Sequence, residues 1–453
     1  MMLAFHFRPM PEGCRPMWRL YRITLAALLA VPTGAGAQLG TSPLPGLPNL
    51  PAVLPGQVQV PGERVDARRV TGAVPRLVEL RRLVEAHPDV IDVDPRGSPI
   101  VRGELLAIAP APEVLDRLRA AGFTVAADAA LAGLDLQIVT LKMPAGMAPG
   151  RALRILRRID PDGVYDFNHL YTRAGDVAPE PPNDHAGRGA VARPTGAAAV
   201  KIGLLDGGVN SDHPALRGAA IWRWGCAGAN VPSEHGTAVA SLLVGQAPGF
   251  SGVLPAGTLY AADVYCGQAT GGNVLTLATA LSWLAAEEVA VINVSLVGPA
   301  NTTLERVIRQ LVTRQVLVVA AVGNDGPTAP PLYPAAYPGV VGVTGVDGRQ
   351  RALIEAGRGP HVWFAAPGAD MAAAAGADGY VAVRGTSFAA PVVAGLLALE
   401  LAAAGPEAAW SRLAAAATDL GRRRRDDVYG AGLVGERYRV LPEALAGLTV
   451  PAR

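Results

Sequence analysis

The sequence predicts an α/β fold: a doubly wound, mostly parallel sheet with helices on both faces, preceded by a small α+β domain. Two observations predict it. Beyond residue 200, strand-length runs of Val, Ile and Leu alternate with helical stretches and lack polar alternation. Such runs are typical of parallel strands buried on both faces and covered by helices. Upstream, residues 63–172 carry shorter apolar runs and amphipathic stretches of their own, which predicts a separate domain.

Length and charge narrow the classes of function. The chain has 453 residues, enough for two or three domains, and half of them are hydrophobic. Only 17% are charged, and the formal net charge is +2. This balance predicts neither a nucleic-acid partner nor an acidic tail.

The N-terminus has the pattern of an export signal. Arg19 and Arg22 precede an apolar run at 23–31, and Ala-Gly-Ala at 35–37 fits a small-x-small cleavage site. The alternative, a membrane anchor, needs about 20 apolar residues, and this run is shorter. We therefore predict a signal peptide at 1–37, a periplasmic or secreted protein, and no membrane span after signal removal.

Two segments without regular structure flank the first domain. Six prolines among small residues at 38–62 predict a Pro-rich linker. Residues 173–199 are rich in Pro, Gly and Ala, which opposes regular structure. This second stretch is predicted to be an exposed linker that contains a processing site.

The domain at 63–172 has the element order of a sheet with helices on one face, as in ferredoxin-like α+β domains. Leu77, Leu80 and Leu83 have helical spacing. The sequence then predicts a strand at 105–109, a helix at 113–121, a strand at 136–142, a helix at 152–159 and an extended segment at 164–167.

The second domain, at 200–447, supplies the parallel sheet. Its clearest strands are predicted at 200–205, 258–264, 289–294, 316–321 and 339–343, with helices at 276–287 and 302–314. Thr302 and Glu305 have the spacing of a capping box. The apolar run 392–404 is predicted to be a core helix, because it is too short for a membrane span and contains Glu400.

Three polar residues lie at the ends of these elements. Asp206 follows the first strand, at the edge where α/β sheets bind ligands. His235 opens a helix in the motif EHGT at 234–237, and Ser387 lies in GTSFAAP at 385–391, where another helix begins. A serine nucleophile needs an imidazole to take its proton and a carboxylate to orient that imidazole. Together the three residues predict covalent catalysis by serine.

The order Asp, His, Ser along the chain resembles that of the subtilisin-like serine proteases and differs from the chymotrypsin-like and α/β-hydrolase orders. The resemblance covers residues 200–440. It implies a serine endopeptidase for protein or peptide substrates, which acts through an acyl-enzyme on Ser387 without a cofactor. It also implies a zymogen, in which the upstream domain is a propeptide that inhibits its own chain; a permanent accessory domain is the alternative.

The same resemblance assigns an oxyanion hole. Asn324 follows the strand at 316–321 and would donate its amide to the oxyanion, beside the backbone N–H of Ser387. Asn-Asp-Gly is also good turn chemistry, so a turn residue is the alternative. The motifs around Asp206, His235 and Ser387 favour the catalytic role.

The resemblance further implies a substrate groove, whose wall pairs with the substrate backbone by strand addition. Its predicted residues are Ser295, Leu296, Val297 and Gly298. Val297 stands where Gly is usual, which predicts a preference for small side chains before the scissile bond.

Two positions depart from the usual subtilisin pattern. Gly207 stands where Ser or Thr is usual, and Ala238 where a second His is common. Neither supplies a triad atom, so we expect altered support around the site rather than loss of activity. The stretch between residues 244 and 259 lacks the six to eight oxygen ligands that calcium needs, so no metal is predicted there.

The cysteines and the other histidines complete the sequence predictions. In an exported chain, Cys226 and Cys266 are expected to form a disulfide, with two separate buried thiols as the alternative. His213, before a proline, is predicted on a surface turn, and His169 and His361 are predicted to be surface or packing residues.

Two other functions remain as alternatives. An esterase is disfavoured, because the Gly-x-Ser-x-Gly elbow is missing and the triad order is wrong. The other alternative is a catalytically inactive, subtilisin-like protein that binds peptides. Competent side chains at Asp206, His235, Ser387 and Asn324 favour an active enzyme.

Overall fold

The computed structural model describes residues 76–176 and 200–445. The predicted signal peptide at 1–37, the linker at 38–62 and most of the linker at 173–199 lie outside the described residues. The described residues all belong to one unit, from Val65 to Arg453, so the two predicted domains pack against each other.

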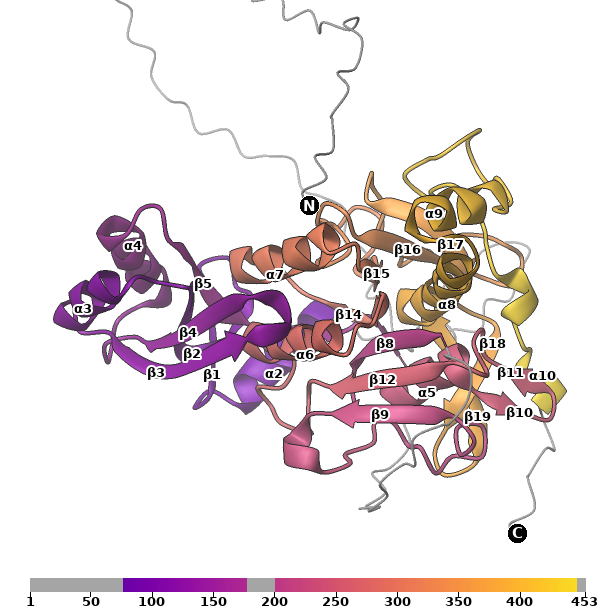
Figure 1. The fold of residues 1–453 in the computed structure, drawn as a ribbon, viewed down its shortest axis with the longest axis horizontal. Coiled ribbons are helices and arrows are strands. Elements are labelled where there is room, and N and C mark those ends of the chain that lie inside the picture. Colours follow the sequence, from indigo (N-terminus) through magenta and orange to yellow (C-terminus); the bar gives the residue numbers. More distant parts are fainter. Residues whose placement is uncertain (1–75, 177–199, 446–453) are drawn as a thin grey trace, which may run out of the picture. The chain divides into compact units, whose positions relative to one another are not determined.

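The upstream region forms an antiparallel sheet with the strand order β5-β2-β4-β3, as in a ferredoxin-like domain (Figure 1). The short strand β1 pairs with the first residues of β2. The strand β3 was not predicted, because it is mostly exposed and carries no apolar alternation. The elements are α2 (Arg76–Ala86), β1 (Ile91–Val93), β2 (Pro99–Ile108), α3 (Pro112–Ala120), β3 (Thr124–Leu131), β4 (Leu136–Lys142), α4 (Pro149–Ile159) and β5 (Val164–His169).

The downstream region is built on seven parallel strands in the order β17-β16-β15-β13-β8-β12-β9. This confirms the predicted doubly wound α/β sheet. The predicted strands are present with shifted ends, whereas the two edge strands, β9 and β17, were not predicted. The strands are β8 (Lys201–Asp206), β9 (Ala220–Trp224), β12 (Thr258–Asp263), β13 (Val291–Val294), β15 (Leu317–Ala321), β16 (Val341–Val346) and β17 (Val362–Pro367).

Helices cover both faces of this sheet. The helices α5 and α8 share one apolar core with it, and α6 and α7 share a second core. The helices are α5 (Glu234–Val244), α6 (Val274–Ala286), α7 (Thr302–Thr313), α8 (Thr386–Ala404), α9 (Pro406–Ala415) and α10 (Pro442–Leu445). Short strands complete the fold: β6 (Thr172–Arg173), β7 (Gly175–Asp176), β10 (Gln246–Ala247), β11 (Phe250–Ser251), β14 (Leu296–Val297), β18 (Met371–Ala375) and β19 (Gly379–Gly385).

The helix α8 is longer than the sequence suggested. It spans 19 residues and is long and apolar enough, by length and composition, to cross a membrane. Its first 13 residues, from Thr386 to Ala398, are buried inside the fold. This burial agrees with the predicted core helix, although the argument that the run is too short was wrong.

The two faces of the upstream sheet are covered differently. One face packs on α3 and α4 through a core that contains Leu118 and Leu156. The other face contributes Leu106, Leu131 and Ile138 to the core of α6 and α7, which lie beside it in Figure 1. The packing of this second face therefore depends on downstream elements.

The strand β5 binds the start of both helices. The Asp166 carboxylate accepts hydrogen bonds from the backbone N–H (2.7 Å) and the hydroxyl (3.0 Å) of Thr302. The side-chain oxygen of Asn168 accepts one from the N–H of Leu275 (3.1 Å). A carboxylate at the start of α7 is also favoured by the helix dipole.

The predicted capping box at Thr302 and Glu305 is wrong. The residue that caps α7 is Asn301, whose side-chain oxygen accepts from the N–H of Leu304 (2.9 Å). The hydroxyl of Thr302 instead bonds to Asp166. The sequence could not show this, because Asp166 lies far upstream in the chain.

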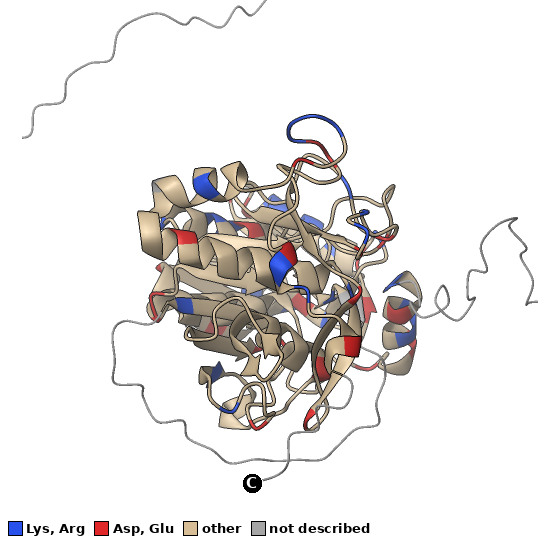
Figure 2. Ribbon diagram, turned by 90° about the vertical axis from the view of Figure 1, so that its right-hand side faces the viewer, with Lys and Arg blue, Asp and Glu red and all other residues tan. Residues whose placement is uncertain are grey.

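Charged residues of both signs are interspersed over the face shown in Figure 2. This distribution fits the low net charge of the chain.

Candidate active site

Asp206 and His235 meet at the carboxyl end of β8. Both side chains are buried, and Nδ1 of His235 lies 2.9 Å from each carboxylate oxygen of Asp206. The backbone N–H of Gly207 also donates to the Asp206 carboxylate (2.6 Å). A carboxylate in this position holds the proton on Nδ1, which leaves Nε2 as the basic atom.

The start of α5 fixes the position of His235. The hydroxyl of Ser233 caps this helix by accepting from the N–H of Gly236 (2.9 Å). A Cβ atom at Gly236 would lie 2.3 Å from the carbonyl oxygen of Gly207, so only glycine lets α5 approach the end of β8 this closely. The sequence motif at 234–237 includes this glycine, but the capping role of Ser233 was not predicted.

Ser387 lies in the first turn of α8 and is 0% exposed. Its hydroxyl donates to the carbonyl oxygen of Ser295 (3.4 Å). Within the described residues, the buried Nε2 atom of His235 has no hydrogen-bond partner. The ring of Phe388, the next residue, lies 5.3 Å from the imidazole of His235 between ring centres, so the start of α8 lies beside His235.

Two donors converge on one backbone carbonyl. The side-chain amide of Asn324 and the backbone N–H of Ser387 (3.4 Å) both donate to the carbonyl oxygen of Ala174. The other end of the Asn324 amide accepts from the N–H of Thr386 (3.2 Å), which orients it. These are the two donors that the sequence assigned to an oxyanion hole.

The chain itself occupies the predicted groove. The strand β6 pairs antiparallel with β14, so that Arg173 lies opposite Leu296 and Thr172 opposite Val297. The N–H of Ala174 donates to the carbonyl of Ser295 (3.2 Å). On the other side of Ala174, β7 pairs with β19. An extended backbone thus passes through the site and is held on both sides of the Ala174 carbonyl.

Sequence analysis placed residues 173–176 at the start of an exposed linker. In the structure, Ala174 is buried. Local composition could not predict this, because the pairing partners of the segment lie more than a hundred residues downstream.

Gly298 and Val297, two of the predicted groove residues, contact different neighbours. A Cβ atom at Gly298 would lie 2.6 Å from the ring of Tyr171, so this glycine makes room for the buried tyrosine. The Tyr171 hydroxyl donates to the carbonyl of Pro299 (2.6 Å), and burial raises the pKa of this tyrosine well above its usual value. Val297 is buried and packs against Gly323, next to Asn324.

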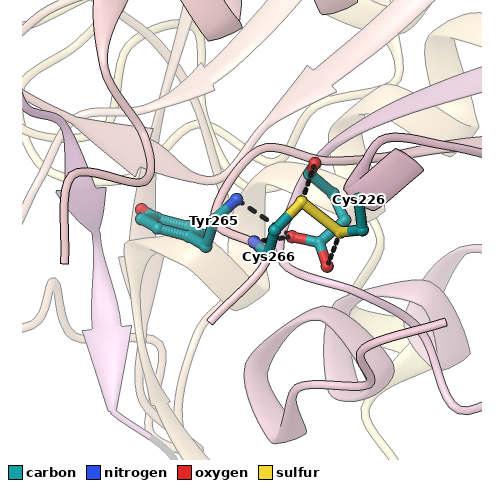
Figure 3. The surroundings of a disulfide bond; sticks show 4 residues. Cys226, Tyr265 and Cys266 are labelled. Carbon is teal, nitrogen blue, oxygen red and sulfur yellow. Dashed lines mark hydrogen bonds between the residues drawn. A yellow bond between two sulfur atoms is a disulfide. The ribbon is translucent and has the colours of Figure 1, made fainter. Parts of the chain in front are cut away.

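Cys226 and Cys266 lie next to each other, close to Tyr265 (Figure 3). Their sulfur atoms are 2.17 Å apart, and their Cα atoms 5.2 Å apart. Between them lies Asp263, whose carboxylate accepts from the N–H groups of Tyr265 (2.9 Å) and Cys266 (3.0 Å). Asp263 ends β12, directly opposite Asp206 on β8. Burial raises the pKa of Asp263, and the Asp206 charge adds to this effect.

Among the described residues, one group has atoms that lie close enough together to hold a metal ion: Cys226, Asp263 and Cys266. With the two sulfur atoms joined to each other, the group offers only the Asp263 carboxylate. It does not match the ligand sets of metal sites in proteins.

The prediction for His213 was wrong. Its side chain is completely buried: Nδ1 accepts from the N–H of Ala215 (3.1 Å), and Nε2 lies 2.9 Å from the carbonyl oxygen of Gly379. Burial lowers its pKa. His169 is a buried packing residue, as one of its two predicted alternatives stated, and pairs with Asp94 (3.2 Å).

A second contact next to Asn324 comes from α2. The Arg76 guanidinium makes a two-pronged ion pair with the Asp325 carboxylate (2.8 to 3.1 Å), and both side chains are about one-seventh exposed. Planar pairs of this kind fix orientation as well as charge.

Comparison with known proteins agrees with the geometry. The model of the subtilase family matches residues 197–432. Subtilisin E of Bacillus subtilis (strain 168) and subtilisin of Bacillus pumilus are each 33% identical over 259 residues. The alignments cover 52% of this chain, and 64% and 88% of those proteins, so the match spans slightly less than two thirds of subtilisin E.

A solved structure shares the fold over a longer stretch. Fervidolysin from Fervidobacterium pennivorans, a keratinolytic enzyme related to subtilisin, superposes with a TM-score of 0.60 at 19% identity. The match covers 80% of this chain and 63% of fervidolysin.

Proposed function

Because this chain belongs to the subtilase family of serine endopeptidases, we propose that Ser387 attacks the peptide carbonyl and forms an acyl-enzyme. His235 is the general base, and Asp206 orients it. Asn324 and the backbone N–H of Ser387 stabilise the oxyanion. The substrates are proteins or peptides that extend along Ser295 to Gly298.

One observation carries this proposal. The carbonyl of Ala174 accepts hydrogen bonds from both oxyanion donors, while its backbone is paired on either side. This is how a peptide substrate must lie for attack by Ser387.

The first reaction is therefore cleavage of the chain itself, between Ala174 and Gly175. The Ser387 oxygen bonds to the Ala174 carbonyl carbon, and the hydroxyl proton passes to Nε2 of His235. That proton then goes to the departing nitrogen of Gly175 as the peptide bond breaks. Water, activated by His235, hydrolyses the ester and frees the Ala174 carboxylate.

The upstream domain, 63–172, acts as an intramolecular inhibitor until this cut and stays bound as a separate fragment after it. Asp166 and Asn168 bind the start of α7 and α6, and the domain delivers residues 171–174 into the groove. Released enzyme then has a free groove for other peptides. The pattern at 1–37 and the adjacent sulfur atoms of Cys226 and Cys266 support a secreted or periplasmic protein, since that compartment is oxidising.

The test compares the full chain with its Ser387→Ala variant and with Ser411→Ala, a matched control at an exposed serine on α9. The unchanged chain and the Ser411 control should give a fragment that begins at Gly175. Both should react with a fluorophosphonate probe at Ser387. Ser387→Ala should do neither. Asn324→Leu should slow cleavage about 10²–10³-fold.

A folded chain that remains full length and unlabelled would contradict the proposal. It would favour the inactive peptide-binding alternative. A fragment that begins elsewhere would leave the activity standing and refute Ala174–Gly175 as the scissile bond.

A further inference from the structure

The residue before Ala174 is held by contacts that the proposed chemistry does not require. Building on the proposed function, we propose that the site selects a basic side chain at the second position before the scissile bond. Tyr265 and Asp263 determine this specificity. The position is filled here by Arg173, and the same two residues would recognise Arg or Lys in other substrates.

The Arg173 side chain stands over an aromatic face. Its guanidinium carbon lies 5.3 Å from the centre of the Tyr265 ring, within the range of a cation–π interaction. The Tyr265 hydroxyl donates to the carbonyl of Tyr171 (3.2 Å), so the ring is also tied to the substrate strand. Arginine is well suited to such a site, because its planar group stacks on rings.

Gly207 forms another side of this subsite. A Cβ atom there would lie 3.7 Å from a guanidinium nitrogen of Arg173. The departure at Gly207 therefore adjoins the space that Arg173 uses, and a Cβ atom there would first meet the hydroxyl of Ser233, at 2.3 Å.

The electrostatics of the site also favour a cation. Asp206 and Asp263 end adjacent strands in register, which places two buried carboxylates beside each other. Burial raises the pKa of Asp263, and the Arg173 charge opposes this rise. Within the described residues, no direct ion pair joins Arg173 to either carboxylate, so the attraction acts through space and is screened by salt.

The sulfur contact between Cys226 and Cys266 holds the subsite in place. Cys266 follows Tyr265 directly and contacts Cys226, and Asp263 binds the backbone N–H groups of Tyr265 and Cys266 (Figure 3). The loop that carries the ring is therefore fixed at several points. Such a preorganised loop can discriminate between side chains, because binding costs little ordering.

The first experiment is a double-mutant cycle on self-cleavage of the full chain. The rate is measured for Arg173→Met, Tyr265→Leu and the combination, with Tyr265→Phe as the matched control that keeps the ring. Arg173→Met should slow cleavage about tenfold in the unchanged chain and in Tyr265→Phe. In Tyr265→Leu, the same change should cost about twofold or less. Arg173→Lys should retain most of the rate.

The second measurement uses separate peptides that copy residues 171–176, with Arg or Met at the position of Arg173. The ratio of kcat/KM for the two peptides should favour Arg about tenfold, and it should fall in 1 M salt and in Asp263→Asn. If Tyr265 and Asp263 only supported the fold, the ratio of kcat/KM for the Arg and Met peptides would be the same in 1 M salt and in Asp263→Asn.

The outcomes separate the two proposals. Equal cleavage of both peptides, or the same cost of Arg173→Met with and without the ring, overturns the specificity and leaves the protease intact. If neither peptide nor the chain is cleaved, and Ser387 stays unlabelled, the proposed function is overturned and the specificity falls with it.

Discussion

The two folded regions of this molecule differ in how they bury their sheets. The downstream sheet has helices of its own region on both faces, with α5 and α8 on one side and α6 and α7 on the other. The upstream sheet has helices of its own on only one face. Its second face is covered by α6 and α7 of the downstream region. The downstream region therefore covers both faces of its sheet with its own helices, whereas one face of the upstream sheet is covered only by helices of the downstream region.

The largest effect expected from this difference concerns the upstream region by itself. Expressed alone, residues 76–174 would expose Leu106, Leu131, Leu134 and Ile138. Each of these side chains contributes about 1.5–3 kcal/mol through burial, so the fragment should lose most of its stability. Circular dichroism and hydrogen exchange should show no cooperative unfolding transition.

Addition of the downstream region, carrying Ser387→Ala, should restore the protection of the fragment. The comparison fails if the isolated fragment unfolds cooperatively at the same temperature as it does in the full Ser387→Ala chain.

A smaller effect is expected at the polar contact between the two regions. Asp166→Ala removes two hydrogen bonds to Thr302 at the start of α7, and the carboxylate involved is buried. The full Ser387→Ala chain should lose about 1.5–3 kcal/mol in urea unfolding. The control is Asp128→Ala, whose exposed carboxylate bonds only to Gln137 within β3 and β4 among the described residues. It should change stability by less than about 0.5 kcal/mol. An equal loss of stability in Asp166→Ala and Asp128→Ala would show that Asp166 does not stabilise the contact between the two regions.

The smallest effect is a difference in acid sensitivity. Burial lowers the pKa of His213 in the downstream region, although its bond to the Gly379 carbonyl and the Asp378 charge oppose this. The unfolded chain therefore takes up a proton that the folded chain does not. This stability is complete above the unfolded pKa of about 6.5 and is lost as the pH falls toward the lowered folded pKa.

Asp94 of the upstream region behaves differently. Burial acts to raise its pKa, but hydrogen bonds from His169, Ser98 and Arg96 outweigh burial and lower it. Its contribution persists above the unfolded pKa of about 3.9 and is lost only below it. Mild acid should thus weaken the downstream region first.

The check is thermal unfolding of the Ser387→Ala chain at pH 7.5 and pH 5.5. His213→Gln should reduce the difference between the two pH values by up to about 1 kcal/mol. Asp94→Asn should leave it unchanged. If His213→Gln shows the same difference in stability between pH 7.5 and pH 5.5 as the Ser387→Ala chain, another group causes the acid sensitivity.

The sequence predicted what local patterns determine. Long apolar runs located the central strands, and three motifs located Asp206, His235 and Ser387, because each motif sits at an element end. The patterns failed where a distant partner decides. His213 looked like a turn residue, but the carbonyl of Gly379 gives it a buried partner. Asn301 rather than Thr302 caps α7, because Thr302 bonds to Asp166.

The segment at 171–176 is the clearest case of this limit. Its residues have turn-like composition, and only the fold brings β14 and β19 to either side of them. Two of the predicted groove residues, Leu296 and Val297, pair with this segment, but nothing local could reveal that the chain itself would lie there. The same holds for Tyr265, whose partner Arg173 lies in a different region of the sequence.

The seating of Ala174 in the site has a kinetic consequence. Before cleavage, the upstream domain is tethered to the site, so its effective concentration is set by the chain and does not change on dilution. Cleavage between Ala174 and Gly175 would remove this tether but none of the contacts of β6 with β14 or of Asp166 with Thr302. Inhibition would then become bimolecular. At a high concentration of the cut protein, the fragment would stay bound and the enzyme inhibited. Release into a large volume would let the fragment dissociate and so activate the enzyme by dilution alone.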